Sequence, residues 1–557
     1  MIAAVPEPSQ VPSPPIRLAC TVVLLRDGAD GVETLLLRRT PAAVFMGGYY
    51  VFPGGALVPE DHDAARERLI DLTPAQASAR LSLADGATAF WIAAVRETFE
   101  ECGILLARDR DARAVSASRV STLAADRAAL NAGTQSFKAW LERHALRVDG
   151  GDLAYFDHWI TPPKRPRRFD TRFFLARAPH DQHASPDGIE TVDARWILPH
   201  EALSLADAGT MPVANATQFV LQRLAQASSV DAALAAARAL ETIACNRPCV
   251  AQGSAGARTF VRGDAPYHEI HWCDPDESTQ GTYDLVPGIV KRLDRHVSRL
   301  VAPNPGPMTG PGTNTYFVGD RELAVVDPGP SDDRHVAAIL AHGAGRIRWV
   351  FCTHAHHDHS PAAAMIARAT GAELIGMPPP RSSRHDQTFV PDRIVGDGET
   401  MNLGDVVLTA LHAPGHAPNH VCFRLEATRM LFTGDHVMQG STVVIAPPEG
   451  NMRDYLDSLE RLLRIDVAII APGHGYLIGD AHDEVRKLIQ HRRWREERVL
   501  DALLRHREAD VEMLVDDVYP DLRAVLRAPA MQSLRAHLLK LVEDGKAIAV
   551  GDRYRIA

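Results

Sequence analysis

The chain of 557 residues has few of the features that mark secreted, membrane-spanning or nucleic-acid-coating proteins. Its seven cysteines are too few for a disulfide framework at this length, so a reducing compartment is the simpler expectation. Its longest apolar stretches, such as residues 467–472, fall far short of the ~18 residues that a transmembrane helix needs. The formal net charge of −10 predicts no bulk attraction to nucleic acid or to an anionic membrane. We therefore expect a cytoplasmic protein without a membrane partner.

The composition is that of a folded protein, with 46% hydrophobic and 23% charged residues. At roughly 150 residues per domain, the length suggests three or four domains. Changes in composition predict a disordered tail at 1–15, a first domain at 16–235, a bridging segment at 236–285, a second domain at 286–490 and a small module at 491–557. The first domain is expected to end in one long Ala/Leu-rich helix at about 218–243. The 25 histidines exceed what packing needs and direct attention to metal sites.

Three carboxylates lie on one face of an expected helix in the first domain. In AAVRETFEECGI, at residues 93–104, Glu97, Glu100 and Glu101 fall within an arc of about 100°. Carboxylates that share a face repel one another unless cations neutralise them, so the pattern indicates a site for Mg²⁺ or Mn²⁺. The alternative is a solvated acidic face on a surface helix.

This helix and the glycine turn before it resemble the Nudix family, whose pattern is Gly, five residues, Glu, seven residues and then Arg-Glu-x-x-Glu-Glu-x-Gly. Gly54 and Glu60 keep the first spacing, and residues 96–103 (RETFEECG) keep the second half. Between them the chain departs from the pattern, because 35 residues separate Glu60 from Arg96, so the resemblance gives Glu60 no firm role. FPGG followed by a long insertion resembles the subgroup that includes peroxisomal coenzyme A diphosphatases.

The resemblance implies a Nudix α/β/α sandwich in which Glu97, Glu100 and Glu101 bind the metal ion and act on a substrate diphosphate. Arg96 and Arg168 are the expected substrate-binding residues. Arg96 would orient the carboxylates, and Arg168, in the basic stretch at 164–172, would hold the anionic end of the substrate. The alternative for this stretch is a solvated basic loop.

A histidine–aspartate cluster dominates the second domain. VFCTHAHHDHS, at residues 350–360, follows a strand-like run, and PGH, TGD and PGH follow three later ones. Alternate residues of an extended loop can converge on one point, and imidazole with carboxylate suits Zn²⁺. The candidate ligands are His354, His356, Asp358, His359, His416, Asp435 and His474.

This ordered set resembles the metallo-β-lactamase superfamily, as do GTNTYFV at 312–318 and VVDPGP at 325–330. The resemblance implies an αββα sandwich with two Zn²⁺ ions. His354, His356 and His416 would hold one ion, Asp358, His359 and His474 the other, and Asp435 would bridge them. Asp358 is also the expected catalytic proton acceptor. The set of seven ligand-type residues, with aspartate at position 435, resembles the ligand set of hydroxyacylglutathione hydrolases and nucleases.

The C-terminal residues resemble the winged-helix module of the β-lactamase-like protein group, which includes a mitochondrial endoribonuclease. Residues 501–557 contain nine Lys/Arg and ten Asp/Glu, a net charge of −1. Because phosphate contacts need a basic surface, this charge weakens the expectation of an RNA partner. A packing role or a homodimer contact is the alternative.

We therefore expect a multidomain α+β and α/β protein that is a bifunctional metal-dependent hydrolase of small molecules. Its zinc site would cleave an ester, thioester or phosphodiester, and its Nudix site a diphosphate. A coenzyme A-type substrate would serve both sites, one cutting its diphosphate and the other its acyl thioester. One alternative is an endoribonuclease acting on single-stranded RNA with a regulatory Nudix domain. The other is a Nudix half that is a non-catalytic nucleotide-binding module.

Overall fold

The computed structural model describes residues 14–44, 46–66, 69–163 and 165–557. The chain divides into two compact units, Met1–Pro248 (unit 1) and Cys249–Ala557 (unit 2), and the division falls inside the expected bridging segment. Residues 1–13 of the expected disordered tail lie outside the described residues.

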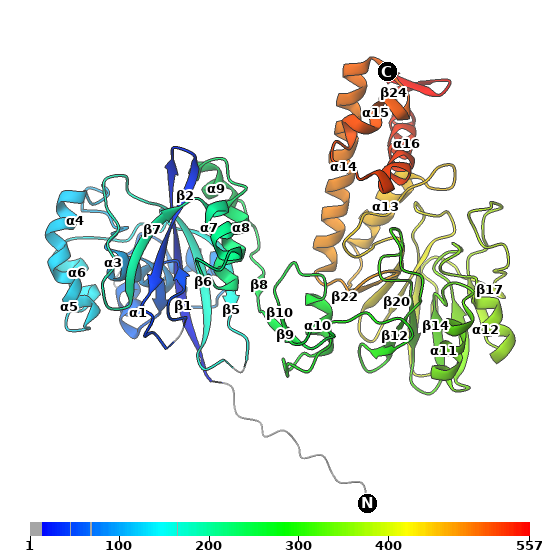
Figure 1. Ribbon diagram of the computed structural model, residues 1–557, viewed down its shortest axis with the longest axis horizontal. Helices are drawn as coiled ribbons and strands as arrows, with labels where there is room; N and C mark the ends of the chain where they lie inside the picture. The colour runs from blue at the N-terminus through cyan, green and yellow to red at the C-terminus, as the bar shows by residue number, and fades with distance from the viewer. Residues whose placement is uncertain (1–13, 45, 67–68, 164) are drawn as a thin grey trace, which may run out of the picture. The chain divides into compact units, whose positions relative to one another are not determined.

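Unit 1 is built on an eight-stranded mixed sheet (Figure 1). Its strands are β1 (Ile16–Gly28), β2 (Gly31–Arg39), β3 (Tyr50–Val51), β4 (Gly54–Ala56), β5 (Ala154–Ile160), β6 (Arg168–Arg177), β7 (Thr191–Ile197) and β8 (Cys245–Asn246). The strand order is β3-β2-β1-β6-β5-β8, with β4 paired to β1 and β7 to β2. β1 and β2 form an antiparallel hairpin closed at Gly28 and Gly31, while β1 and β6 run parallel.

The helices of unit 1 are α1 (Pro59–Arg66), α2 (Pro74–Leu81), α3 (Ala89–Cys102), α4 (Ala117–Leu123), α5 (Arg127–Asn131), α6 (Phe137–Arg143), α7 (Pro199–Asp207), α8 (Asn215–Leu224) and α9 (Val230–Arg238). Helix α3 is buried on nearly all sides, with Trp91 against Phe174 of the sheet and Phe99 stacked on Trp140 of α6. The alternative of a solvated acidic face is therefore wrong, because the Glu97 and Glu100 side chains are each 15% exposed and Glu101 is 4% exposed.

The single long helix expected at 218–243 is also wrong, because the structure has α8 and α9 in its place. The Ser229 hydroxyl accepts a hydrogen bond from the Ala232 amide at 3.1 Å and caps the start of α9. A side chain that bonds to the backbone in this way favours a new helix start over continuation.

Unit 2 contains two larger sheets. Its strands are β9 (Cys249–Ala251), β10 (Arg258–Phe260), β11 (Val290–Arg292), β12 (Val297–Val301), β13 (Asn314–Val318), β14 (Leu323–Val326), β15 (Ile347–Phe351), β16 (Glu373–Gly376), β17 (Arg393–Ile394), β18 (Thr400–Asn402), β19 (Val407–His412), β20 (Val421–Leu425), β21 (Met430–Gly434), β22 (Ile469–Pro472), β23 (Glu508–Ala509), β24 (Ala547–Val550) and β25 (Arg553–Ile556). Strands β11 to β17 form one sheet in chain order, and β18 to β22 form the other.

The helices of unit 2 are α10 (Tyr267–Cys273), α11 (Asp333–Gly343), α12 (Ala363–Thr370), α13 (Met452–Leu462), α14 (Ala481–His506), α15 (Val511–Val518) and α16 (Arg527–Glu543). The two sheets share one core, in which Phe351 lies edge-on to Phe423 with ring centroids 5.0 Å apart. Separate apolar clusters join the first sheet to α11 and α12, and the second to α13 and α14. The four layers are therefore helix, sheet, sheet and helix, as expected.

Residues 249–285 fold as part of unit 2. The short hairpin of β9 and β10 and helix α10 have a small core of their own. Glu269 of α10 is fully buried and accepts hydrogen bonds from Arg299 at 2.6 and 2.9 Å and from Lys291 at 2.7 Å. Burial alone would raise the pKa of Glu269, but the two cations lower it to about 2. This ion pair anchors the segment to the first sheet.

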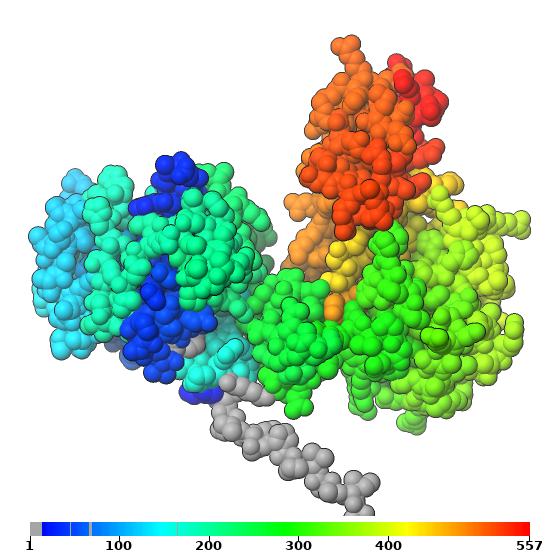
Figure 2. All heavy atoms as spheres, in the orientation of Figure 1, coloured from blue at the N-terminus to red at the C-terminus, as the bar shows by residue number. Residues whose placement is uncertain are grey.

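The C-terminal module consists of α15, α16 and a three-stranded sheet of order β23-β25-β24, packed on the end of α14. Helix α14 is 26 residues long and crosses the expected boundary at 490/491, so the module shares a helix with the rest of unit 2. In the space-filling view it forms a lobe, orange to red, continuous with that unit (Figure 2). Of the helices that the structure describes, none has the length and apolar character needed to cross a membrane.

Candidate metal centres in the two units

Seven histidine and aspartate side chains of unit 2 lie on loops that follow strands. The loop between β15 and α12 carries four of them, and the loops after β19, β21 and β22 carry one each. Strand β15 runs parallel to β14 and β16, and β21 runs parallel to β22, so the strands of each set end at the same edge of their sheet. In chain order the residues are His354, His356, Asp358, His359, His416, Asp435 and His474.

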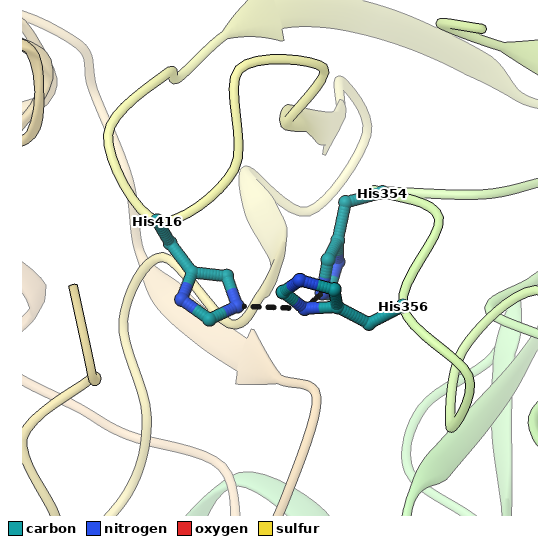
Figure 3. A group of neighbouring side chains, drawn as sticks. All are labelled: His354, His356 and His416. Atoms are coloured by element: carbon teal, nitrogen blue, oxygen red, sulfur yellow. Dashed lines mark hydrogen bonds between the residues drawn. The ribbon is translucent and has the colours of Figure 1, made fainter. Parts of the chain in front are cut away.

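The seven side chains form two groups, and within each group the ligand-type atoms lie within 4.8 Å of one another. The first group is His354, His356 and His416, whose rings converge from two loops (Figure 3). The Nδ1 atom of His356 lies 2.9 Å from His354 Nε2 and 3.0 Å from His416 Nε2.

The second group is Asp358, His359, Asp435 and His474. Its Nε2 and carboxylate atoms are closely spaced, with His474 Nε2 3.3 Å from Asp358 Oδ2 and 3.2 Å from Asp435 Oδ1. Asp435 also joins the two groups, because its Oδ2 lies 3.7 Å from His416 Nε2 and its Oδ1 3.4 Å from His359 Nε2.

A second set of hydrogen bonds fixes the orientation of these rings. The Nδ1 atom of His359 lies 3.0 Å from Asp327 Oδ2, that of His416 2.8 Å from the Val444 carbonyl, and that of His474 3.2 Å from the Gly312 carbonyl. Because carbonyl and carboxylate oxygens accept hydrogen bonds, each Nδ1 carries a hydrogen, and Nε2 is the ring nitrogen that faces the other candidate ligands.

The two groups differ in charge. Burial lowers the pKa of His354 well below its usual value, and burial with the neighbouring His416 lowers the pKa of His356 to about 2. Both rings are therefore neutral, the form that binds a metal. In the second group burial opposes ionisation, yet Asp435 raises the pKa of His474 to about 9 and His359 lowers the pKa of Asp358 to about 2. Without a metal ion, the ionised Asp358 and Asp435 therefore face the protonated His359 and His474.

In unit 1 a buried arginine joins the carboxylates of α3. Arg96 donates from Nε and Nη2 to the two oxygens of Asp61 at 2.9 and 3.0 Å. Its Nη1 donates to Glu97 at 2.9 Å and to Glu100 at 2.8 Å. Burial raises the pKa of Glu97 to about 7, against the opposing charge of Arg96. Arg96 thus orients two of the three expected ligand carboxylates.

The glycine turn of β4 packs directly on the same carboxylates. The Gly54 amide donates to Glu101 Oε2 at 2.9 Å, and a Cβ atom at Gly55 would lie 2.5 Å from the Glu97 carboxylate. The two halves of the motif therefore meet in space despite the long insertion between them.

Glu60 of the motif and Arg168 of the basic stretch bond to other parts of unit 1. Glu60 accepts hydrogen bonds from the Ser136 hydroxyl and, at 2.6 Å, from the Lys138 amide. Arg168, at the start of β6, donates from Nε to the Thr161 carbonyl at 3.1 Å. Residue 164 of the expected basic stretch lies outside the described residues.

Among the described residues, three groups of ligand-type atoms meet the 4.8 Å spacing, and Glu97, Glu100 and Glu101 do not form one of them. The third group is a surface cluster of His296, Asp320 and Asp405 that we did not expect from the sequence.

Comparison with known proteins agrees with this geometry. Residues 308–474 match the profile of the metallo-beta-lactamase superfamily, residues 18–224 the NUDT19 Nudix domain, and residues 511–555 the beta-lactamase associated winged helix domain. The lactamase-like protein aptB of Emericella nidulans is 31% identical over 250 residues, which are 44% of this chain and 77% of that protein. The chain belongs to the metallo-beta-lactamase superfamily. It is a metal-dependent hydrolase whose N-terminal part is a Nudix hydrolase domain.

Other relatives of the metallo-beta-lactamase part have similar coverage. The atrochrysone carboxyl ACP thioesterase of Aspergillus chevalieri is 32% identical over 276 residues, 46% of this chain and 84% of that protein. Among solved structures, a beta-lactamase domain protein from Burkholderia ambifaria is 21% identical, covers 49% of this chain and 96% of its own, and has a TM-score of 0.43. A NUDIX hydrolase from Alicyclobacillus acidocaldarius is 31% identical, covers 40% and 96%, and has a TM-score of 0.35. The expected families, fold class and enzyme class are confirmed.

The metallo-beta-lactamase residues fit a divalent metal ion. His359 Nε2, Asp435 Oδ1 and His474 Nε2 are buried, and none makes a hydrogen bond of good geometry within the described part of the chain. Buried polar atoms without partners are costly, and three that converge on one point are satisfied by a shared cation. The backbone at Gly473 packs closely against two of these side chains. A Cβ atom there would lie 2.8 Å from His359 Cε1 and 2.9 Å from Asp435 Oδ1.

A cavity of about 270 Å³ opens onto both groups. Of the described residues, those that line it are Met308, His356, Asp358, Arg384, His416, Asp435, Met438, Val443, Val444, Ala446, Glu449 and Gln532. Arg384 is the one cationic side chain in this lining, and its Nη1 lies 3.6 Å from Glu449.

Sequence reasoning missed four residues that complete these sites. Asp327 stands in VVDPGP, where an aspartate between a buried strand and a Pro-Gly turn was a usable signal. Asp61 follows Glu60 directly, one position beyond the family spacing. Arg384 and Gln532 reach the cavity from distant segments, and no local pattern marks them.

Proposed function

We propose that unit 2 hydrolyses an ester or thioester at a dinuclear zinc site. The observation that carries the proposal is Asp435, whose two carboxylate oxygens face the two separate groups of ligand-type residues. A carboxylate in this position would bridge two ions and hold them close enough to act together.

The ligand set supports zinc. Zn²⁺ binds histidine nitrogen at about 2.0–2.1 Å in a tetrahedral arrangement, which places neighbouring ligand atoms roughly 3.3 Å apart. The four histidine–aspartate separations in the second group, from 3.2 to 3.5 Å, agree with this value. His354, His356 and His416 would hold one ion, and Asp358, His359 and His474 the other. When bound, the two ions supply Lewis acidity for attack by water on a carbonyl carbon.

The protein's own groups then bind the substrate and move a proton. Asp358 is 28% exposed, more than the buried histidines beside it, so water and substrate reach its carboxylate. The Asp358 carboxylate is the acceptor for the proton that the attacking water gives up. His474 Nε2 lies 3.3 Å from this carboxylate.

The cavity favours an acyl substrate over a polyanion. Met308, Met438 and Val443 offer an apolar wall, and Arg384 has Glu449 beside it. The net charge of −1 over residues 501–557 is also unfavourable for RNA. The Aspergillus chevalieri relative is named a thioesterase, which supports a thioester in particular.

For the Nudix domain we propose hydrolysis of a diphosphate, with Glu97, Glu100 and Glu101 holding Mg²⁺ or Mn²⁺. Buried carboxylates aligned by Arg96 and packed on a glycine turn support this function. An acyl-coenzyme A would serve both sites, because it contains a thioester and a diphosphate. One observation favours the rival, a nucleotide-binding module without catalysis: Arg96 already pairs with both Glu97 and Glu100.

A panel of diphosphates, thioesters, esters and single-stranded RNA tests these proposals, with purified protein supplied with Zn²⁺ and Mg²⁺. We expect Asp358→Ala to abolish ester or thioester hydrolysis and to leave diphosphate hydrolysis intact, and Glu100→Gln to do the opposite. RNA cleavage lost in Asp358→Ala would replace the thioesterase proposal with a nuclease. No diphosphate hydrolysis by the wild type would support the binding module.

A further inference from the structure

The segment 443–446, between β21 and α13, lies directly against the metal ligands. The Val444 carbonyl accepts the hydrogen bond from His416 Nδ1 at 2.8 Å. Val443, Val444 and Ala446 also line the cavity beside both ligand groups. The position of this short segment therefore fixes the direction in which His416 Nε2 points.

The C-terminal module holds this segment from the other side. The Val443 carbonyl accepts a hydrogen bond from Arg492 of α14, and the Ile445 amide donates to Ser533 Oγ of α16 at 3.4 Å. Arg492 and Ser533 are 2% and 6% exposed, so water does not compete for these bonds. The residues on both sides of Val444 are thus tied to the C-terminal helices.

Helix α16 also reaches the cavity directly. Gln532, next to Ser533, lines the same cavity as His356, Asp358, His416 and Asp435. Its side-chain amide offers both hydrogen-bond donors and an acceptor. Of these two neighbouring residues of α16, Ser533 bonds to segment 443–446 and Gln532 lines the cavity.

Ion pairs keep α16 in place. Lys540 bonds Glu496 of α14 at 2.9 Å, with both side chains less than one-seventh exposed, and Arg453 of α13 pairs with Glu543 at 3.2 Å. The helix that carries Gln532 and Ser533 is thus fixed to the two helices beneath it.

We propose that the C-terminal module is part of the active site of unit 2. Arg492 and Ser533 are positioning residues that orient His416 through segment 443–446, and Gln532 binds the substrate. The inference rests on the proposed function. It narrows the substrate to an acyl ester or thioester that has a polar group beyond the scissile bond. Its apolar body lies against Met308 and Met438, and a carbonyl, amide or hydroxyl group beyond the scissile bond reaches Gln532.

Substrate contact by Gln532 is tested with Gln532→Leu, which keeps the size of the side chain and removes its hydrogen bonds. The matched control is Gln490→Leu, an exposed glutamine of α14 that does not line the cavity. The probes are p-nitrophenyl acetate, whose acyl group has no polar atom beyond the scissile ester, and a series of acyl thioesters with polar groups at increasing distance from the scissile bond.

For Gln532→Leu we expect KM to rise about 5- to 10-fold for the thioesters that carry the polar group, in keeping with one lost hydrogen bond. We expect kcat to stay near wild type, p-nitrophenyl acetate hydrolysis to be unchanged, and Gln490→Leu to match the wild type. Equal KM values for Gln532→Leu and wild type across the series would overturn the substrate contact. A wild type inactive on every ester and thioester would instead overturn the proposed function.

The positioning role is tested by metal retention, which does not depend on the substrate. We expect Ser533→Ala to bind zinc roughly 3- to 10-fold more weakly in competition with a colorimetric chelator, because it loosens a support of His416. The control is Ser331→Ala, an exposed serine on another loop. Thermal unfolding in excess chelator separates a general loss of stability from a loss of metal affinity. Equal zinc affinity in the two variants would overturn the positioning role.

Discussion

Asp327 gives the sharpest test of how unit 2 holds its metal ions. Its Oδ2 lies 3.0 Å from His359 Nδ1 and accepts from the Thr353 hydroxyl at 2.8 Å, and its Oδ1 accepts from the Thr353 amide at 2.8 Å. Asp327 is 2% exposed. One buried carboxylate therefore orients a ligand ring and the residue that precedes His354.

Asparagine is the informative substitution at this position. Asp327 has a φ of 49°, a backbone conformation that asparagine adopts more readily than most residues, so Asp327→Asn keeps the local fold. The amide removes the negative charge, and one of its two ends is a donor. If that end faces His359 Nδ1–H, two donors oppose each other, and the ring loses its preferred orientation.

We expect Asp327→Asn to weaken zinc binding about 10- to 100-fold, as is typical for the loss of a carboxylate behind a histidine ligand. That factor corresponds to about 1.4–2.7 kcal/mol of binding free energy. The assay is chelator competition with bound zinc measured by atomic spectroscopy, and Asp333→Asn, an exposed aspartate of α11, is the control. Zinc affinity within twofold of wild type would refute the reasoning that Asp327 orients His359.

Three further predictions concern buried charge and close packing. Asp61→Asn removes the charge and one acceptor oxygen from the partner of Arg96 Nε and Nη2 and should destabilise unit 1 by about 1.5–3 kcal/mol in urea unfolding. Glu60→Gln should cost under about 1 kcal/mol. Equal effects of the two changes would contradict this. The pKa of Glu269 is lowered to about 2 from 4.5, so its ionised form stabilises the fold above pH 4.5 and loses that contribution as the pH falls toward 2. The stability gap between wild type and Glu269→Gln should be about 3 kcal/mol at pH 7 and should narrow below pH 4.5; a gap independent of pH from 7 to 3 would oppose this account. Gly473→Ala should lower the zinc content, because the added methyl group would collide with His359 and Asp435; full zinc occupancy would show that the loop adjusts.

The ligand geometry of unit 2 follows from the sequence because its signals are local. His354, His356, Asp358 and His359 share one loop, and a glycine stands beside each of the later ligands. Such short spacings leave the backbone few ways to place the side chains, so the pattern alone predicts their convergence.

Features that depend on distant contacts were not predicted. The pairing of Arg96 with Asp61 arises because α1 packs on α3 across the insertion, and spacing alone pointed to Glu60. Gln532 reaches the cavity because α14 continues past the expected boundary at 490/491 and carries α16 back onto the sandwich. The break between α8 and α9 depends on the single cap at Ser229, which a pattern of apolar residues does not reveal.

The central claim is that the bridged groups of unit 2 form a hydrolytic site distinct from that of the Nudix domain. Acyl-coenzyme A, which contains both a thioester and a diphosphate, tests it in one reaction followed by mass spectrometry of the products. We predict that the wild type cleaves both bonds, that Asp435→Asn cleaves only the diphosphate, and that Glu100→Gln cleaves only the thioester. Thioester hydrolysis by Asp435→Asn at the wild-type rate would contradict the claim.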